Sequence, residues 1–171
     1  MGGTMNLDDR VELRRRQWAV EMPSLDTGGM AILGRARVIT LSVRPAIEKV
    51  FDSHGLDTGN FDVLSTLLRS GQPYRLRPTE LFRWLMITSG GLTARVSRLE
   101  KRGLVERVPD PADGRSMLVG LSADGLEKAR STIVEDMRTE AELLDGLSAE
   151  EREALAELLR KLAVSLESKG L

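Results

Sequence analysis

Apolar residues recur at helical spacing in the first half of the chain. Leu7 and Val11 mark a short amphipathic helix over residues 6–21, which ends at Met22 and Pro23. A second helix, capped by Asp26 or Thr27, is predicted to run to Phe51 with Pro45 inside it. A third is predicted over residues 60–70, because its apolar residues recur at i, i+3 and i+7: Phe61, Leu64 and Leu68.

Two closely spaced helices follow. Pro78 opens a short helix that runs to Leu85, because proline is harmless at a first helical position. After a turn at residues 87–91, Thr88 or Ser89 is expected to cap the next helix. That helix carries an apolar stripe formed by Leu92, Val96 and Leu99. Two helices joined in these proportions predict a helix-turn-helix over residues 81–104.

The hydrophobic period changes to that of strands after Leu104. Residues 104–108 and 116–121 are rich in β-forming side chains, and a six-residue Pro/Asp/Gly loop at 109–114 separates them. A hairpin directly after a helix-turn-helix is in the position of a wing. The expected fold is therefore mostly α with a small β-hairpin wing.

Two further helices are predicted at the C-terminal end. Ser122 caps the first, and Ser148 with Glu151 forms a capping box for the second. The last helix presents more apolar surface than a terminal helix of a monomer needs, which indicates an interface. Its apolar residues are Leu155, Leu158, Leu159, Leu162 and Leu166.

The distribution of charge along the chain indicates what kind of partner this fold binds. The net charge is only −1, yet residues 69–115 contain ten Lys or Arg and five Asp or Glu, so this segment is +5 and the rest −6. A basic middle with acidic flanks is typical of a DNA-binding module carried on a separate scaffold. A solvated arginine-rich surface is the alternative.

Small and polar residues lie opposite the apolar stripe of the second helix, where they would let it approach the floor of a major groove. The arginines beside them could contact guanine edges or phosphates. The candidate DNA-binding residues of the segment are Thr88, Ser89, Gly90, Thr93, Arg95, Ser97, Arg98 and Arg102.

Three segments, residues 86–93, 98–105 and 110–115, resemble the MarR family of bacterial transcriptional regulators. The likeness spans roughly residues 30–168. It implies a wing in which Arg115 reaches the minor groove, although Gly114 stands where arginine is common at the tip. It also implies a homodimer, whose twofold symmetry predicts a palindromic operator in double-stranded DNA. We expect a repressor, with an activator as the alternative. The expected organisation is an N-terminal extension at 1–24, a dimerisation region at 25–55 and 122–171, and a winged helix-turn-helix domain at 56–121.

The N-terminal extension contains Trp18, and Asp62 and Arg69 lie on the third predicted helix. Together these features resemble the urate-responsive branch of that family. In this branch a small anionic or aromatic effector such as urate would be bound by Trp18, Asp62, Arg69 and Arg95. Asp62 and Arg69 are seven residues apart, nearly two helical turns, so they share one face of the predicted helix. The alternatives are that this face is simply solvated and that the regulator works without an effector.

The composition excludes several other classes. The chain has no cysteine and one histidine, His54, so it lacks thiolate chemistry and metal-ligand clusters, and no catalytic motif is present. We expect no enzyme activity, no cofactor, no membrane segment and a cytoplasmic location. A winged helix that binds a partner protein instead of DNA is the main alternative function.

Overall fold

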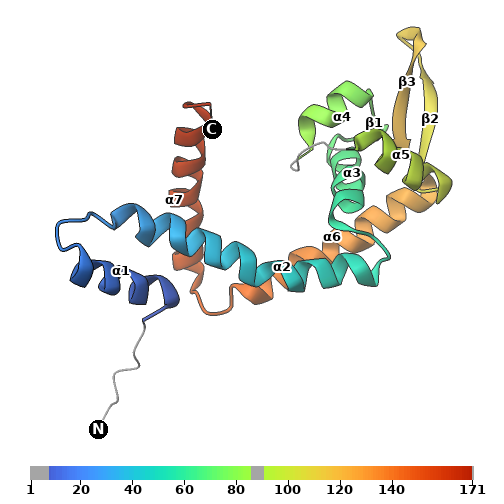
Figure 1. Ribbon diagram of the computed structural model, residues 1–171. Helices are drawn as coiled ribbons and strands as arrows, with labels where there is room; N and C mark the ends of the chain where they lie inside the picture. Colours follow the sequence, from blue (N-terminus) through green and yellow to red (C-terminus); the bar gives the residue numbers. More distant parts are fainter. Residues whose placement is uncertain (1–7, 86–90, 171) are drawn as a thin grey trace. The chain divides into compact units, whose positions relative to one another are not determined.

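The computed structural model describes residues 8–85 and 91–170 (Figure 1). The chain divides into two units, residues 1–45 and residues 46–171. Mostly helical elements with one small sheet confirm the predicted fold class. Within the described ranges, no helix combines the length and the apolarity that crossing a membrane requires.

The first unit contains helix α1 (Arg10–Glu21), a π-helical turn η1 (Met30–Gly34) and the start of helix α2 (Arg35–Ser53). Asp9 caps α1 by accepting hydrogen bonds from the backbone N–H groups of Val11 and Glu12, at 2.9 and 2.7 Å. Val11 is buried against Gly34, where an added Cβ would come within 3.1 Å of its side chain. The close approach of α1 to η1 therefore depends on a residue without a side chain.

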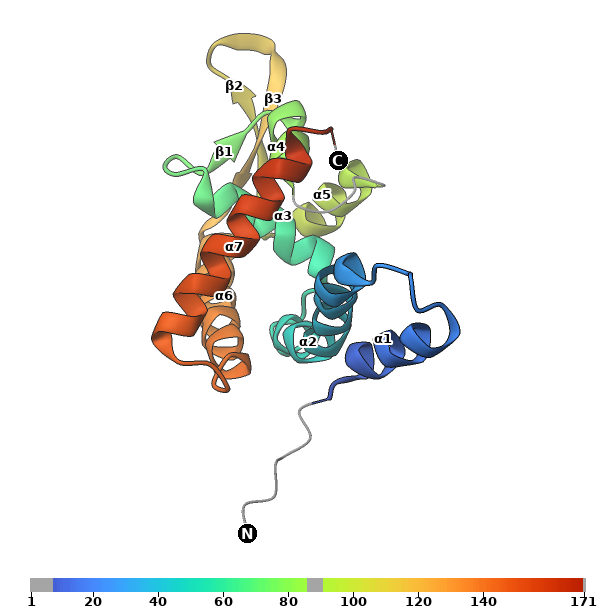
Figure 2. The same ribbon diagram turned by 90° about the vertical axis from the view of Figure 1, so that its left-hand side faces the viewer.

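The second unit is built around helix α3 (Thr58–Arg69). Asp57 caps this helix, which therefore begins two residues earlier than predicted. Its side chains Val63, Leu64 and Leu67 are fully buried in a core shared with helices α5 (Leu92–Lys101) and α6 (Ala123–Leu143) and with the sheet. Figure 2 shows α3 at the centre of this unit. This core fixes the positions of α5 and the sheet.

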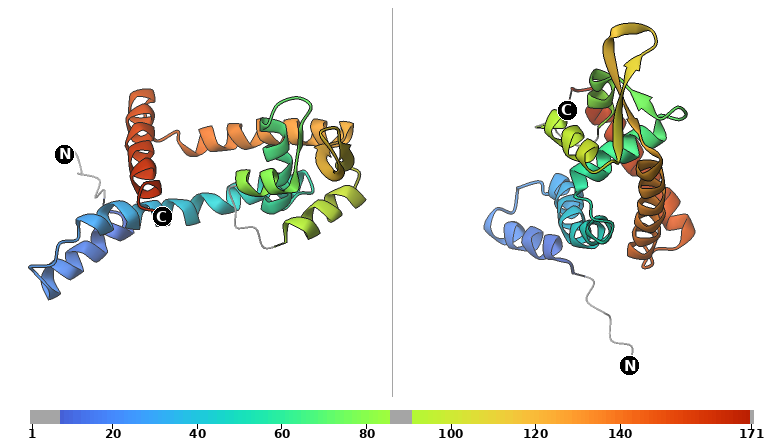
Figure 3. Two further views of the ribbon diagram at one scale, coloured as in Figure 1. Left: turned by 90° about the horizontal axis from the view of Figure 1, so that it is seen from above. Right: turned by 90° about the vertical axis from the view of Figure 1, so that its right-hand side faces the viewer.

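The sheet has three antiparallel strands in the order β1-β3-β2: β1 (Arg75–Leu76), β2 (Val105–Asp110) and β3 (Asp113–Leu121). The hairpin β2–β3 projects from the helices (Figure 3). Our prediction of a six-residue loop is wrong, since only Pro111 and Ala112 lie between the strands. Side-chain to backbone hydrogen bonds extend the strands: Asp110 accepts from Ala112 N–H at 2.9 Å, and Asp113 from Arg115 N–H at 3.1 Å.

Serine caps begin both C-terminal helices, as predicted. Ser122 accepts a hydrogen bond from Gly125 N–H, and Ser148 forms the capping box of helix α7 (Ala149–Glu167). None of the 19 residues of α7 is buried. His54, directly after α2, contacts α6: its Nε2 lies 2.8 Å from the Glu135 carboxylate.

Candidate nucleic-acid interface

Helix α4 (Pro78–Trp84) and helix α5 form the predicted helix-turn-helix (Figure 1). Pro78 occupies the first turn of α4, as expected. Val96 and Leu99 are 3% and 0% exposed, and Leu92 packs against the same core. The predicted apolar stripe is confirmed, and it holds α5 with its opposite side toward solvent.

The described part of α5 begins later than predicted. Gly91 is its N-cap, with φ of 95°, and the expected caps Thr88 and Ser89 lie outside the described residues. Glycine adopts this left-handed conformation without steric cost, which explains its place at the turn. The candidate DNA contacts Thr88, Ser89 and Gly90 lie outside the described residues.

The solvent side of α5 presents a cationic side chain among small ones. Thr93, Ala94 and Arg98 are exposed and Ser97 is half-buried. The side chain of Arg98 makes no hydrogen bond or ion pair with any residue that the structure describes. Its guanidinium is therefore available to a phosphate or a base edge.

The other two arginines of α5 contact the protein. The half-buried Arg95 lies over Gly59 of α3, where an added Cβ would be 2.6 Å from its Nη1 atom. Arg102, at the C-cap, donates a hydrogen bond to the Gly55 carbonyl oxygen at 2.9 Å. Arg102 thus ties the end of α5 to the loop before α3, a role that the sequence did not reveal.

A buried carboxylate anchors the wing to the start of α4. Asp110, 5% exposed, accepts a hydrogen bond from Nε of Arg77 at 2.7 Å. The Ala112 N–H group and then the Arg77 guanidinium hold the pKa of Asp110 below its usual range. Arg115 is exposed near the tip. Arg77 was absent from the predicted site, because its partner lies 33 residues away.

Two predicted effector residues, Asp62 and Arg69, lie along one side of α3. Four residues on this side of α3 follow the spacing i, i+3, i+7 and i+10: Gly59, Asp62, Thr66 and Arg69. We call this set the α3 stripe. Asp62 and Thr66 are 8% and 0% exposed, so the alternative of a solvated face is wrong at these two positions. Arg95 packs on the Gly59 end.

Arg69 connects the other end of the α3 stripe to the helix-turn-helix. Its Nη2 donates a hydrogen bond to Thr66 Oγ1 at 2.8 Å and another to the backbone carbonyl of Trp84. Trp84 is the last residue of α4. Trp18, the fourth predicted effector residue, is 41% exposed on α1 and belongs to the first unit.

Known proteins share this arrangement. The sequence pattern of the MarR family matches residues 54–116. The transcriptional regulator PecS of Dickeya dadantii (strain 3937) is 34% identical over 147 residues, which cover 86% of this chain and 89% of PecS. The chain belongs to the MarR family. Its similarity to PecS over most of both chains supports membership of the branch that includes PecS.

Solved structures of MarR-family proteins agree with this assignment. A cysteine-to-serine mutant of Escherichia coli MarR, in complex with operator DNA, is 26% identical, with a TM-score of 0.63 over 85% of this chain and 96% of that one. A MarR-like regulator from Bacillus cereus shows the same fold at 21% identity, with a TM-score of 0.71 over 82% of this chain and 99% of that one. The protein is a DNA-binding transcriptional regulator, and its relatives are regulators rather than enzymes.

Proposed function

We propose that this MarR-family protein is a homodimeric repressor that binds a palindromic operator and is released by a small anionic, aromatic effector such as urate. The observation that carries the DNA-binding part is the exposed side of α5. There Arg98, which has no side-chain partner among the described residues, stands beside Thr93 and Ala94 on a helix anchored by Leu99. Arg115 would contact the adjacent minor groove from the wing.

Helix α7 supports the dimer. Leu155, Leu158, Leu159 and Val164 are 40–64% exposed, and no α7 residue is buried within the chain. A helix gains little stability without packing of its apolar side, so a second copy of the chain is the partner that we propose for it. A twofold dimer would bind two half-sites about one helical turn apart.

The α3 stripe supports the effector. A buried carboxylate at Asp62 lies on the same side of α3 as Arg69, and Arg95 packs at the Gly59 end. Arginine guanidinium groups bind planar anions through paired hydrogen bonds. An anion bound along this side would be attracted by the two arginines and repelled by Asp62.

The proposed response follows from the two arginines. Arg95 belongs to α5 itself, and Arg69 bonds the last carbonyl group of α4. An effector that takes hydrogen bonds from either guanidinium competes with these contacts, and its binding energy would favour a different spacing of α4 and α5. Effector binding would then lower the affinity for DNA, and DNA binding would lower the affinity for the effector.

The test uses fluorescence anisotropy of the intergenic DNA beside the protein's own gene, with and without urate. We expect urate to weaken DNA binding by the wild type and to raise its melting temperature, and both effects to vanish in Arg69→Ala. Arg138→Ala is the matched control, because Arg138 is an exposed arginine of α6. A wild-type protein whose DNA binding responds to no purine or aromatic acid would disprove the effector. Operator binding without steep salt dependence would instead favour the alternative of a winged helix that binds a partner protein.

A further inference from the structure

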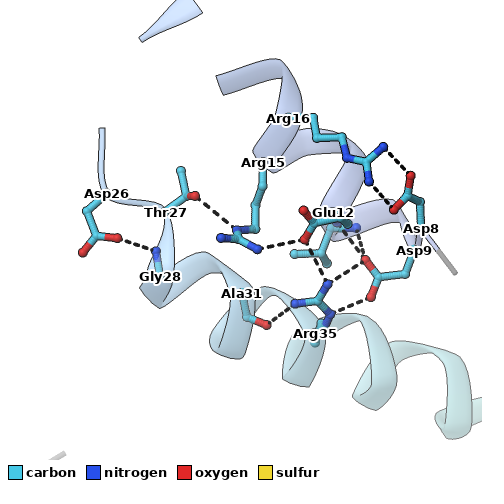
Figure 4. Close-up of polar contacts among 11 residues, drawn as sticks. Asp8, Asp9, Glu12, Arg15, Arg16, Asp26, Thr27, Gly28, Ala31 and Arg35 are labelled. Atoms are coloured by element: carbon cyan, nitrogen blue, oxygen red, sulfur yellow. Dashed lines mark hydrogen bonds and ion pairs between the residues drawn. The ribbon is translucent and has the colours of Figure 1, made fainter. Parts of the chain in front are cut away.

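Three arginines of the first unit are paired with carboxylates (Figure 4). Arg35 lies 2.6 Å from Asp9, and Arg15 lies 2.8 Å from Glu12. The third, Arg16, lies 2.6 Å from the carboxylate of Asp8. Arg35 also lies 3.3 Å from Glu12, and its two ion pairs hold α1 on the start of α2. The acidic residues at the beginning of α1 are therefore all paired with these three arginines.

Four other arginines of this unit have no such partner among the described residues: Arg44 and three that lie together. The side chains of Arg10, Arg14 and Arg37 make no ion pair or hydrogen bond with any residue in the described part of the chain. All three line one cavity of about 550 Å³ between α1 and the start of α2. Among the described residues, no acidic side chain lines it. We call it the arginine cavity.

Two features of the arginine cavity favour an anion within it. Arg10 and Arg14 are one helical turn apart on α1, a spacing at which like charges repel. Arg37 adds a third positive charge from α2. An anion between them would relieve this repulsion and accept charge-assisted hydrogen bonds.

The remaining lining defines the rest of the ligand. Val11, 2% exposed, lines the cavity, and Met30, Val38 and Leu41 contribute further apolar side chains. A nucleic-acid phosphate presents no apolar group to such a lining, whereas a ring or short alkyl chain does. The lining therefore favours a small molecule over a DNA backbone.

We propose that the arginine cavity binds a small organic anion with an apolar body, such as an aromatic carboxylate. The guanidinium groups hold the carboxylate, and the apolar side chains cover the ring. The cavity shares no residue with the α3 stripe, so this site is distinct from the effector site proposed above. Because its walls come from both α1 and α2, an occupant clamps the N-terminal helix onto the body of the first unit.

The test is calorimetric titration of the full chain with 2-naphthoate, with the neutral 2-naphthamide and with inorganic phosphate. We expect 2-naphthoate to bind at least about tenfold more tightly than either of the other two. The substitutions Arg14→Gln and Arg37→Gln should each weaken the binding of 2-naphthoate by about tenfold. The control is Arg16→Gln, on the same helix but outside the cavity. Its affinity for 2-naphthoate should stay within about twofold of the wild-type affinity.

Arg69→Ala separates this site from the proposed effector site, and naphthoate binding should persist in that variant. Equal binding of the amide and the acid, or equal competition by phosphate, would overturn the proposal. So would a change of oligomeric state in the Arg14→Gln/Arg37→Gln double variant without added ligand, because the arginines would then pair with a second copy. A lower salt dependence of operator binding in that double variant would assign them to DNA phosphates instead.

Discussion

The guanidinium of Arg95 on α5 lies directly over Gly59 on α3, in space that any other residue's Cβ would occupy. The absent side chain brings a charged group of α5 against the polar side of α3. The helix that carries the candidate DNA contacts and the buried side of α3 therefore meet at one residue pair.

Gly59→Ala should move Arg95 without unfolding the protein. The clash falls on the end of a flexible side chain, and alanine is favoured over glycine inside a helix by about 1 kcal/mol. We expect an unchanged or slightly higher melting temperature, together with a weaker urate response. Circular dichroism and DNA anisotropy measure the two quantities. An unaltered urate response would remove Arg95 from the proposed effector site.

Arg98 and Arg102 should behave differently although both are exposed arginines near the end of α5. The Arg98 side chain is unpaired among the described residues, whereas Arg102 bonds the Gly55 carbonyl. Arg98→Ala should weaken operator binding by about tenfold and lower its salt slope by about 1. Arg102→Ala should chiefly lower stability, by about 1 kcal/mol. The reverse pattern would assign the phosphate contact to Arg102.

Gly125→Ala should be among the most damaging single substitutions. A Cβ at Gly125 would overlap the Leu104 carbonyl oxygen and come within 2.8 Å of its carbon, and both atoms belong to the backbone. Backbone cannot swing aside as a side chain can, so we expect a loss of at least about 3 kcal/mol in urea denaturation. Gly146→Ala, where an added Cβ meets nothing within 4 Å, is the control.

Asp136 should make stability rise as the solution is acidified toward pH 5. Its side chain is 4% exposed on α6, and burial together with the nearby Glu140 raises its pKa to about 6. Because the folded pKa lies above the unfolded one, the folded protein binds the extra proton between about pH 4 and pH 6. The stabilisation from this proton is complete below the unfolded pKa and is lost as the pH rises through about 6.

The neutral variant Asp136→Asn should therefore be more stable than wild type at pH 8, by about 1 kcal/mol after allowance for solvent screening. That difference corresponds to a melting temperature about 2–4 °C higher. The advantage should shrink as both proteins are brought to pH 5. A pH-independent advantage would mean that the gain does not come from the carboxylate charge.

The apolar side of α7 should determine the oligomeric state. Leu158 is 64% exposed, so Leu158→Glu costs little within one chain but places a charge in the proposed interface. Light scattering should give a dimer for wild type and a monomer for Leu158→Glu at the same concentration. Lys161→Glu, on the polar side of α7, serves as the control. A wild-type monomer would refute the dimer directly.

Local sequence signals predicted much of this fold. The serine caps of α6 and α7, Pro78 at the start of α4 and the stripe through Val96 and Leu99 depend on neighbours within one or two helical turns. For such features the relevant interactions are already present in a short segment. Their predicted positions are confirmed for that reason.

Features that depend on distant partners were missed. Strand β1 has only two residues and exists through its pairing with β3, so it leaves no periodic pattern. The burial of Thr66, the Arg77–Asp110 pair and the Arg102–Gly55 hydrogen bond also join segments far apart in sequence or depend on their packing. A helix of mixed polarity such as α3 does not reveal which polar residues the core will cover.

The lack of any buried residue in α7 has a consequence for how the regulator responds to its own abundance. If association supplies the packing that this helix lacks, apparent stability increases with protein concentration by mass action. Newly made chains at low copy number would then be less well folded and less able to occupy an operator than the same chains later. Accumulation of the protein would itself set the threshold at which its target genes are silenced.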